Sequence, residues 1–556
     1  MEQIGSFLAC VEHSIIEHWD RDALTDYEGS TLQYKDVARK IEKIHILFEH
    51  AGIRQGDKIA LCGRNSANWA VAFLATLTYG AVAVPILHEF KAEQVHNIVN
   101  HSEAKLLFAG DHVWTTLDEA AMPVLEGIIN IPDYSLLVSR TDLLTNAREH
   151  LNELFGKKYP KNFRQEHISY HHDAPEEMAM INYTSGTTSF SKGVMIPYRA
   201  MWSNLDFALR ALGVHMKVGD HVISMLPMAH MYGMAFEFIF EFVFGCHIFF
   251  LTRVPSPRVI FQAFADIKPS VVVSVPLVIE KIMRKVVLPK LQTPRMKMLL
   301  KIPVINQKVR DKVREQVFQA FGGNFYQIIV GGAAFNSEVE AFLHQIGFNF
   351  TVGYGATECA PIISYVDWHD FRTTSCGKPA PRMEVRINSR DPENEVGEIL
   401  CRGANVMLGY YKNPEATKEA LDDEGWYHTG DLGVMDADGY LYIKGRSKNM
   451  LLGASGQNIY PEEIEDKLNN MLLVNESVVI QKGEKLYGLV YPDFEEAHGL
   501  GLADEDLEQV MEQNRRELNE LLPTYSQLSG IKIRMEEFEK TPKRSIKRFL
   551  YADEAV

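Results

Sequence analysis

The segment 183–193 groups hydroxyl side chains, two glycines and a lysine between apolar runs of strand length at 178–182 and 194–196. It reads Tyr-Thr-Ser-Gly-Thr-Thr-Ser-Phe-Ser-Lys-Gly. A loop of this composition between strands can offer backbone N–H groups, hydroxyls and an ammonium to a polyphosphate. It is not a Walker loop, because Lys192 precedes the glycine and strand-like residues follow instead of a helix. The segment predicts a phosphate-binding loop, with a polar surface turn as the alternative.

Three further stretches carry residue types that suit the rest of a nucleotide and its metal. Gly332 follows an apolar, strand-like run, so a flat ring could approach the backbone there. Glu358 ends the stretch 353–358, and Mg²⁺ binds a carboxylate together with phosphate oxygens. Asp431 and Arg446 supply an acceptor and a charged donor, which suit ribose hydroxyls. For the aspartate, an ordinary turn residue is the alternative.

A histidine, His230, lies in the fourth stretch, 226–234, which reads Leu-Pro-Met-Ala-His-Met-Tyr-Gly-Met. Taken alone, such a histidine is more often a core residue than a functional one. A functional role for His230 is therefore inferred only in combination with the other stretches.

Composition limits the class of protein. The chain has 556 residues, long enough for two or more domains, and 46% hydrophobic residues with 23% charged residues predict a globular, soluble protein. The net charge of −16 argues against nucleic acid as the main partner, although a locally basic site can still hold an anion. The six cysteines are scattered without metal-ligand spacing and suit a reducing compartment.

Targeting signals and membrane spans are not apparent in the sequence. The N-terminus lacks the basic region of a secretory signal, so we expect a cytoplasmic location, with peripheral contact at the inner membrane face left open. The most apolar region, 225–251, is interrupted by Glu237 and Glu241, which are four residues apart and share one helix face. This pattern predicts a buried amphipathic helix and not a membrane span. The sequence does not determine the oligomeric state.

Alternating helix and strand patterns predict the elements that position these residues. The region 1–50 reads as helical, apart from a short strand at 31–34. A strand at 57–62, a helix at 65–79 and a strand at 81–85 form a βαβ unit, which implies a parallel sheet. Further strands are expected at 221–225, 246–251, 270–275 and 326–330. We expect a large doubly wound α/β region that binds ligands beyond the carboxyl ends of its strands.

The pattern of predicted elements changes from about residue 376 onward. Short strands at 384–387, 397–401 and 440–443 predict a small antiparallel β unit. The final 110 or so residues alternate helix and strand patterns and predict a small α+β domain. Pro461, followed by Glu462 and Glu463, is a good helix start.

In this order the motifs resemble those of the adenylate-forming superfamily, which includes acyl-CoA synthetases, luciferases and the adenylation domains of peptide synthetases. The resemblance covers nearly the whole chain: 183–193 is similar to the phosphate loop, 354–358 to the Tyr-Gly-x-Thr-Glu motif, 427–431 to the Thr-Gly-Asp motif and 445–448 to the hinge. The runs 354–361 and 449–465 are most similar to bacterial long- and medium-chain fatty acyl-CoA synthetases.

The resemblance implies a domain plan and a nucleotide site. Residues 1–445 would form the large adenylation domain, 446–448 the hinge and 449–556 a small, mobile C-terminal domain. The phosphates of ATP would be held by Thr184, Ser185, Gly186, Thr187, Thr188 and Lys192. Mg²⁺ would be bound by Thr184 and Glu358. Gly332, Ala333 and Tyr354 would flank the adenine, and Asp431 and Arg446 would hold the ribose. Gly355 and Thr357 would also belong to the nucleotide site. His230 would lie beside the acyl site and Lys448 would be the pivot.

The implied reaction activates a fatty acid with ATP to give acyl-AMP and pyrophosphate, and then transfers the acyl group to coenzyme A. Lys192 and a lysine of the small domain would stabilise the phosphoryl charge. One alternative is an acyl- or aryl-adenylating enzyme with another acceptor, such as a carrier protein. The other is a lipid-binding relative without ligase activity. Acyl chain length cannot be read from the sequence.

The chain departs from the family pattern at three positions. Ser189 and Ser191 stand where the family usually has Gly and Pro, which a turn tolerates. Ser545 stands where the family has an essential lysine near the C-terminus. Lys543 or Lys547 would replace that lysine, and we favour Lys547, with a solvated basic tail as the alternative.

Overall fold

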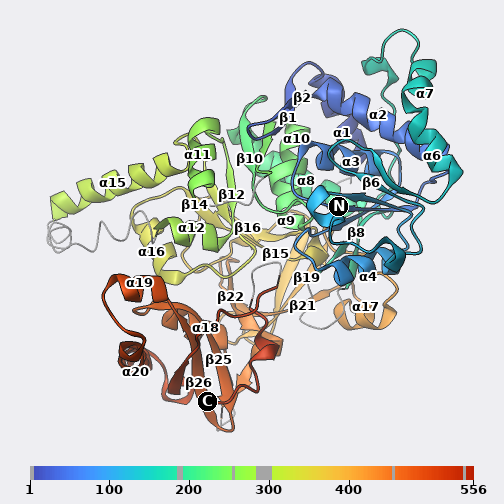
Figure 1. Cartoon of the computed structure of the whole chain (residues 1–556). Helices are drawn as coiled ribbons and strands as arrows, with labels where there is room; N and C mark the ends of the chain where they lie inside the picture. The colour runs from blue at the N-terminus through green and yellow to red at the C-terminus, as the bar shows by residue number, and fades with distance from the viewer. Residues whose placement is uncertain (1–4, 185–191, 253–256, 284–302, 454–456, 542–545) are drawn as a thin grey trace.

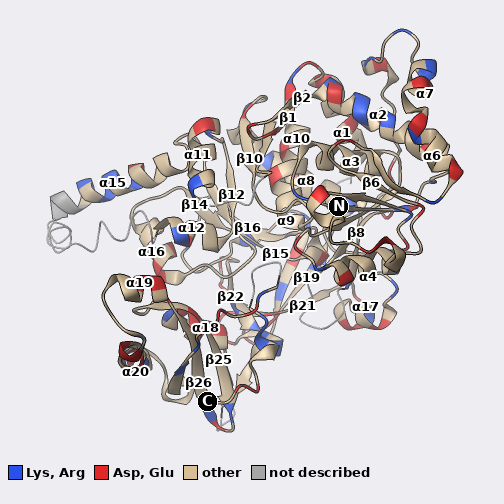
Figure 2. Ribbon diagram, in the orientation of Figure 1, with Lys and Arg blue, Asp and Glu red and all other residues tan. Residues whose placement is uncertain are grey.

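The computed structural model describes residues 5–184, 192–252, 257–283, 303–453, 457–541 and 546–556. A large mixed α/β region extends from the N-terminus through the blue, green and yellow parts of Figure 1, and a smaller orange-to-red part lies below it. This arrangement confirms the predicted fold class. Both charge signs are spread along the peripheral helices α2 (Tyr34–Ala51), α6 (Asp142–Glu149) and α7 (Leu151–Lys158), as expected for solvated helix faces (Figure 2).

The largest sheet has eight strands in the order β20-β9-β8-β4-β3-β5-β6-β7. β3 pairs in parallel with β4, and α3 (Ala67–Thr78) connects them, so the predicted βαβ unit is confirmed. Every residue of β4 is buried, as in a parallel sheet that is covered on both faces. The strands are β3 (Lys58–Cys62), β4 (Val82–Ile86), β5 (Leu106–Ala109), β6 (Gly127–Asn130), β7 (Leu136–Ser139), β8 (Met178–Tyr183), β9 (Gly193–Pro197) and β20 (Gly409–Tyr410).

A second sheet corrects the expectation that residues 1–50 are mainly helical. α1 (Phe7–Glu17) and α2 are helices, but Asp22–Asp26 forms strand β1. β1 pairs in parallel with β11 (His247–Phe250), placing Leu24 opposite Ile248. The strand depends on this distant pairing, which a local pattern does not reveal. The sheet is completed by β2 (Thr31–Gln33) and β10 (His221–Ser224).

The expected helix around 225–251 is divided and more deeply buried than an amphipathic helix. It consists of α9 (Met231–Met234), the π-helix η4 (Ala235–Ile239) and α10 (Phe240–Phe244). The side chains of Glu237 and Glu241 are each only 1% exposed, so the prediction of burial is confirmed and that of a polar face is wrong. Neighbouring segments enclose this helix on all sides, as they do for helices of large cores. Among the described residues, every helix is too short or too polar to cross a bilayer.

A parallel sheet and a small antiparallel sheet follow. The parallel sheet has the order β12-β13-β14, formed by Val272–Ser274, Ile328–Val330 and Phe350–Val352. The antiparallel sheet contains β15 (Tyr354–Gly355), β16 (Ile362–Tyr365) and β17 (Lys378–Pro379). The expected strands at 270–275 and 326–330 are confirmed. The accompanying helices are α8 (Tyr198–Ala211), α11 (Pro257–Ile267), α12 (Pro276–Ile282), α15 (Pro303–Ala320) and α16 (Ser337–Gln345).

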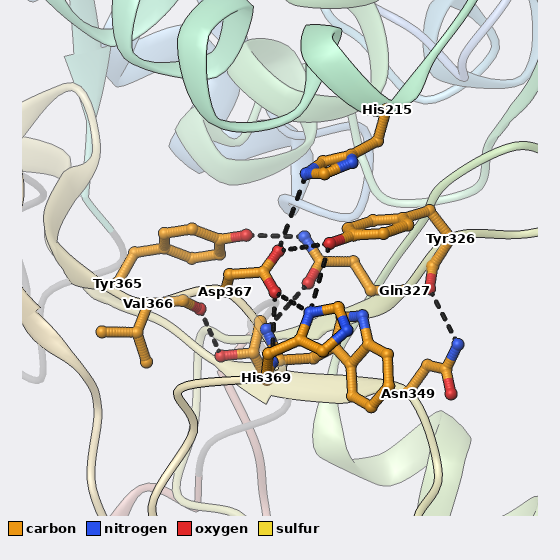
Figure 3. Close-up of polar contacts among 10 residues, drawn as sticks. His215, Tyr326, Gln327, Asn349, Tyr365, Val366, Asp367 and His369 are labelled. Atoms are coloured by element: carbon orange, nitrogen blue, oxygen red, sulfur yellow. Dashed lines mark hydrogen bonds and ion pairs between the residues drawn. The ribbon is translucent and has the colours of Figure 1, made fainter.

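A polar cluster links the start of β13 to the end of β16 (Figure 3). The Tyr326 hydroxyl donates to Asp367 Oδ2 at 2.9 Å, and Gln327 Nε2 donates to the Tyr365 hydroxyl at 2.5 Å. The His215 ring stacks on Tyr326 with 3.7 Å between centroids. Burial opposes ionisation of Asp367, but hydrogen bonds outweigh it and lower the pKa of this carboxyl. The cluster thus fixes two strands whose adjoining loops contain candidate site residues.

The predicted antiparallel β unit is present as a four-stranded sheet. Its order is β18-β19-β21-β22, formed by Met383–Asn388, Gly397–Gly403, Tyr427–Met435 and Leu441–Arg446. β21 and β22 pair antiparallel, with Asp431 opposite Arg446. Two residues that are distant in sequence therefore meet on neighbouring strands.

The C-terminal part has its own hydrophobic clusters. Its main sheet contains β25 (Val474–Lys482), β26 (Lys485–Pro492) and β27 (Leu528–Ile533), with α18 (Pro461–Leu468) and α20 (Asp504–Leu521) beside it. α18 begins at Pro461 with two glutamates in its first turn, as predicted. The Ser337 hydroxyl of the large region donates to Asp466 Oδ2 at 2.6 Å. Polar contacts such as this one join the two parts in this arrangement.

Candidate active site

The ribose-side residues form one hydrogen-bonded unit. The Tyr354 hydroxyl donates to Asp431 Oδ2 at 2.5 Å, and Arg446 Nε lies 2.8 Å from Asp431 Oδ1. Burial raises the pKa of Asp431, while the positive charge of Arg446 and the hydrogen bond from Tyr354 act in the opposite direction. The Coulombic effect of Asp431 in turn raises the pKa of Arg446. The structure therefore brings together three residues that the sequence assigned to the nucleoside.

The glycine pair after β13 lies against the motif that contains His230. Gly332 has φ +87°, a left-handed conformation that favours glycine. A Cβ at Gly331 would lie 3.1 Å from the Tyr232 ring, a tight contact that favours glycine there. The Tyr232 hydroxyl donates to the Ile329 carbonyl at 3.0 Å. Two separate stretches thus meet at one strand end.

His230 occupies the N-cap position of α9. Its Nδ1 accepts a hydrogen bond from the Tyr232 backbone N–H at 3.2 Å. The ring is therefore oriented by the first turn of the helix. The acyl-site role implied by the resemblance stays a prediction.

At the phosphate side, the ends of the predicted loop are described. The Thr184 N–H donates to the Lys192 carbonyl at 3.0 Å, which closes the loop at its base. Lys192 Nζ lies 4.6 Å from the ring centroid of Tyr410. The predicted phosphate ligands Ser185, Gly186, Thr187 and Thr188 lie outside the described residues.

Tyr410 is a site residue that the sequence reading missed. Its hydroxyl donates to Glu358 Oε1 at 2.9 Å, so one side chain contacts both Lys192 and Glu358. Burial and the nearby Glu358 raise the pKa of the phenol, which therefore stays a hydrogen-bond donor. The only local signal is a Gly-Tyr-Tyr run, which has no distinctive chemistry by itself.

The segment around Tyr410 also forms backbone hydrogen bonds to two other segments that contain predicted site residues. Met407 N–H donates to the Glu358 carbonyl at 2.8 Å, and Tyr411 N–H donates to the Gly193 carbonyl at 2.7 Å. β20 pairs with β9, placing Tyr410 opposite Val194. Residues 407–411 therefore connect the Glu358 turn to the strand that leaves the phosphate loop.

The donor set at Glu358 fits magnesium. The Glu358 carboxylate and the Thr184 hydroxyl are each half-buried and not fully enclosed. Hard oxygen donors of this kind, used one or two at a time with phosphate oxygens, are what Mg²⁺ prefers. Among the described residues, His, Cys, Asp and Glu side chains form no group of three or more that could hold a metal. The Glu358 carboxylate thus has the chemistry of a magnesium ligand, and its assignment to Mg²⁺ together with Thr184 stays a prediction.

The predicted hinge and tail residues are not part of these two units. Lys448 is exposed in the 3₁₀ turn Ser447–Asn449. Lys547 forms an ion pair with Glu539, and Arg548 forms a two-pronged pair with buried Glu465. Lys543 and Ser545 lie outside the described residues. In this arrangement Lys547 is engaged within the C-terminal part.

The fold and these motifs match an established family. The model of the family described as AMP-binding enzyme matches residues 11–411, and the chain belongs to this family. Long-chain-fatty-acid–CoA ligase FadD15 of Mycobacterium bovis is 29% identical over an alignment of 477 residues that covers 82% of this chain and 76% of that protein. The long-chain-fatty-acid–CoA ligase of Escherichia coli O157:H7 is 26% identical over 492 residues, covering 84% of this chain and 81% of that ligase.

A solved structure shows the same fold along the whole chain. The o-succinylbenzoate coenzyme A synthetase of Bacillus subtilis, in complex with ATP and magnesium ion, superposes with a TM-score of 0.74. The match covers 98% of this chain and 99% of that one, at 18% sequence identity. The likeness therefore extends beyond the region matched by the family model, into the C-terminal part.

Proposed function

We propose that this protein is an AMP-forming acid–thiol ligase that activates a fatty acid with ATP and transfers the acyl group to coenzyme A. The observation that carries the proposal is the loop 354–358. At one end Tyr354 contacts Asp431, and at the other Glu358 contacts Tyr410 beside Lys192. One short loop thus links residues suited to a ribose with residues suited to phosphates. The names of the two sequence relatives favour a long-chain fatty acid as the substrate.

In the proposed first step a carboxylate oxygen attacks the α-phosphorus of ATP. The bond to pyrophosphate breaks, and acyl-AMP forms. Lys192 would offset negative charge on the phosphates, and Asp431 with Arg446 would orient the ribose. Glu358 and Thr184 would hold Mg²⁺, which when bound neutralises phosphoryl charge.

In the second step the sulfur of coenzyme A attacks the acyl carbonyl, and AMP leaves. One cleft must serve both steps, so we propose that residues 449–556 rotate as a small domain against residues 1–445, about a hinge at 446–448. Lys448 would be the pivot. Lys547 would exchange Glu539 for the α-phosphate in the arrangement that forms acyl-AMP.

A chain-length series tests the function. Pyrophosphate release is measured with ATP, Mg²⁺ and saturated fatty acids of increasing length, each with and without coenzyme A. We expect release that depends on the acid, and an acyl-CoA product that requires coenzyme A. Release without thioester formation would favour a carrier-protein acceptor. No release with any acid would favour the lipid-binding alternative and contradict the proposal.

The variant Glu358→Gln tests the phosphate-side assignment within this function. It keeps the shape of the side chain but removes the charge that would face a metal. We expect pyrophosphate release to fall by at least about 100-fold, the scale for losing a major electrostatic group. Near wild-type release at limiting Mg²⁺ would contradict the role of Glu358. Circular dichroism of the variant provides the folding control.

A further inference from the structure

Three buried side chains hold the backbone of the loop 225–230, which connects β10 to α9 and ends at His230. Asn65 precedes α3, Asn182 lies in β8 and Glu237 lies in the π-helix η4. Their exposed fractions are 6%, 4% and 1%. The three come from separate elements, and each makes its contact with the main chain of this one loop.

Glu237 and Asn65 hold the first half of the loop. Glu237 Oε2 accepts from the N–H groups of Met225 and Leu226, at 2.9 and 2.7 Å. Asn65 Nδ2 donates to the Leu226 carbonyl at 2.7 Å, and its Oδ1 accepts from Met228 N–H at 2.9 Å. Side chains therefore perform the pairing that a neighbouring strand would otherwise supply.

Asn182 holds the second half of the loop and links it to the phosphate side. Its Nδ2 donates to the Ala229 carbonyl at 3.0 Å, one residue before His230. Asn182 is also two residues before Thr184, at the end of the strand that enters the phosphate loop. A hydrogen bond thus links the residue before His230 to β8, the strand that leads into the predicted phosphate loop.

We propose that Asn182, together with Asn65 and Glu237, positions the loop 225–230. The loop in turn holds the acid at a fixed place relative to the nucleotide phosphates. The proposal rests on the function proposed above and on the predicted place of His230 beside the acid, and it names residues that set the acyl side of that site. None of the three needs to touch substrate. Each acts through the main chain of the loop, because a buried backbone group that loses its partner forces the loop to move or to admit water.

The variants are chosen to change one hydrogen-bonding group at a time. Asn182→Leu keeps about the same size but has no donor for the Ala229 carbonyl. Glu237→Leu removes the acceptor for two N–H groups, whereas Glu237→Gln retains it. Asn514→Ala is the matched control, because this asparagine is also buried and donates to a backbone carbonyl, that of Leu472, at 2.8 Å in the C-terminal part.

Steady-state kinetics give the first readout. For Asn182→Leu and Glu237→Leu we expect kcat/KM for the acid to fall by about 10- to 100-fold, the scale for a displacement of about 1 Å. Binding of a non-hydrolysable ATP analogue, measured by calorimetry, should stay close to wild type. Glu237→Gln and Asn514→Ala should keep the wild-type KM for the acid. An unchanged kcat/KM for the acid in both loop variants, or an equal loss for the acid and the ATP analogue, would overturn the proposal.

Hydrogen exchange of the loop amides provides a readout that does not need activity. The N–H groups of Met225 and Leu226, which donate to Glu237, should exchange slowly in the wild-type protein and faster in Glu237→Leu. Unchanged protection in that variant would overturn the positioning role even if the protein is an active ligase. Conversely, the wild-type protein could be inactive while the protection of these amides is lost in Glu237→Leu. That result would refute the ligase proposal but support the role of Glu237 in holding the loop 225–230.

Discussion

Removing the Tyr410 hydroxyl provides a direct test of the phosphate side of the site. Tyr410→Phe deletes the donor that lies 2.9 Å from Glu358 Oε1 and keeps the ring that lies 4.6 Å from Lys192 Nζ. The variant therefore separates the two contacts of one side chain. Because the raised pKa keeps the phenol protonated, the hydroxyl contributes as a donor across the usual assay range.

The expected magnitude follows from the kind of bond. A hydrogen bond to a charged group contributes about 1.5–3 kcal/mol, which corresponds to roughly 10- to 100-fold in an equilibrium constant. Residues that orient a metal ligand have effects of about the same size on metal affinity. We expect Tyr410→Phe to raise the Mg²⁺ concentration for half-maximal pyrophosphate release by about tenfold or more. Tyr410→Leu, which also loses the ring, should weaken ATP binding further.

The assay titrates Mg²⁺ at saturating ATP and acid, with calorimetric ATP binding in the presence and absence of Mg²⁺. Tyr411→Phe is the matched control, because the neighbouring hydroxyl donates to exposed Glu103 at 3.3 Å. This control should leave the Mg²⁺ dependence unchanged. If Tyr410→Phe also leaves it unchanged at full kcat, the inferred link between Tyr410 and Glu358 has no functional role.

Four other properties can be checked. Burial raises the pKa of Glu241 to about 8 from 4.5, so the folded state holds a proton that the unfolded state releases. The free energy of unfolding should fall by up to about 1.4 kcal/mol per pH unit as the pH rises from about 5 to 8, and urea titrations of Glu241→Gln should show a smaller fall. A thiol reagent should label at most Cys10 rapidly in the native protein, because the other cysteines are buried; fast labelling of several thiols would contradict the described core. Lys547→Ala should abolish acyl-AMP formation but spare transfer from supplied acyl-AMP, while Lys543→Ala does much less; normal adenylation by both would refute the assignment. Lys448→Pro should slow transfer to coenzyme A far more than adenylation, and an equal loss of both would count against the pivot.

Local sequence patterns predict the elements whose periodicity and end signals agree. The βαβ unit around α3 follows from two apolar strand runs on either side of a helical one, and the start of α18 follows from Pro461 and the glutamates after it. The motifs also located Tyr354 and Asp431, which the structure joins by a hydrogen bond. These features are encoded by neighbours in the chain, so a single sequence can reveal them.

Features that depend on distant pairing were not predictable in this way. β1 exists because it pairs with β11, more than 200 residues away, and its own five residues carry little strand signal. The two carboxyl groups of Glu237 and Glu241 suggested a polar helix face, but the surrounding elements enclose them. Tyr410 has no unusual sequence context, and only the pairing of β20 with β9 brings its hydroxyl to Glu358.

The residues missed by the sequence reading share a physical role, which explains why they were missed. Asn182 and Tyr410 belong to strands of the same eight-stranded sheet, on either side of the phosphate loop. From there, Asn182 holds the loop that ends at His230, and Tyr410 holds Glu358. The ribose-side pair, by contrast, lies across β21 and β22 of a different sheet. Variants of Asn182 should therefore act on the acid and variants of Tyr410 on the metal, while Asp431 variants should weaken nucleotide binding.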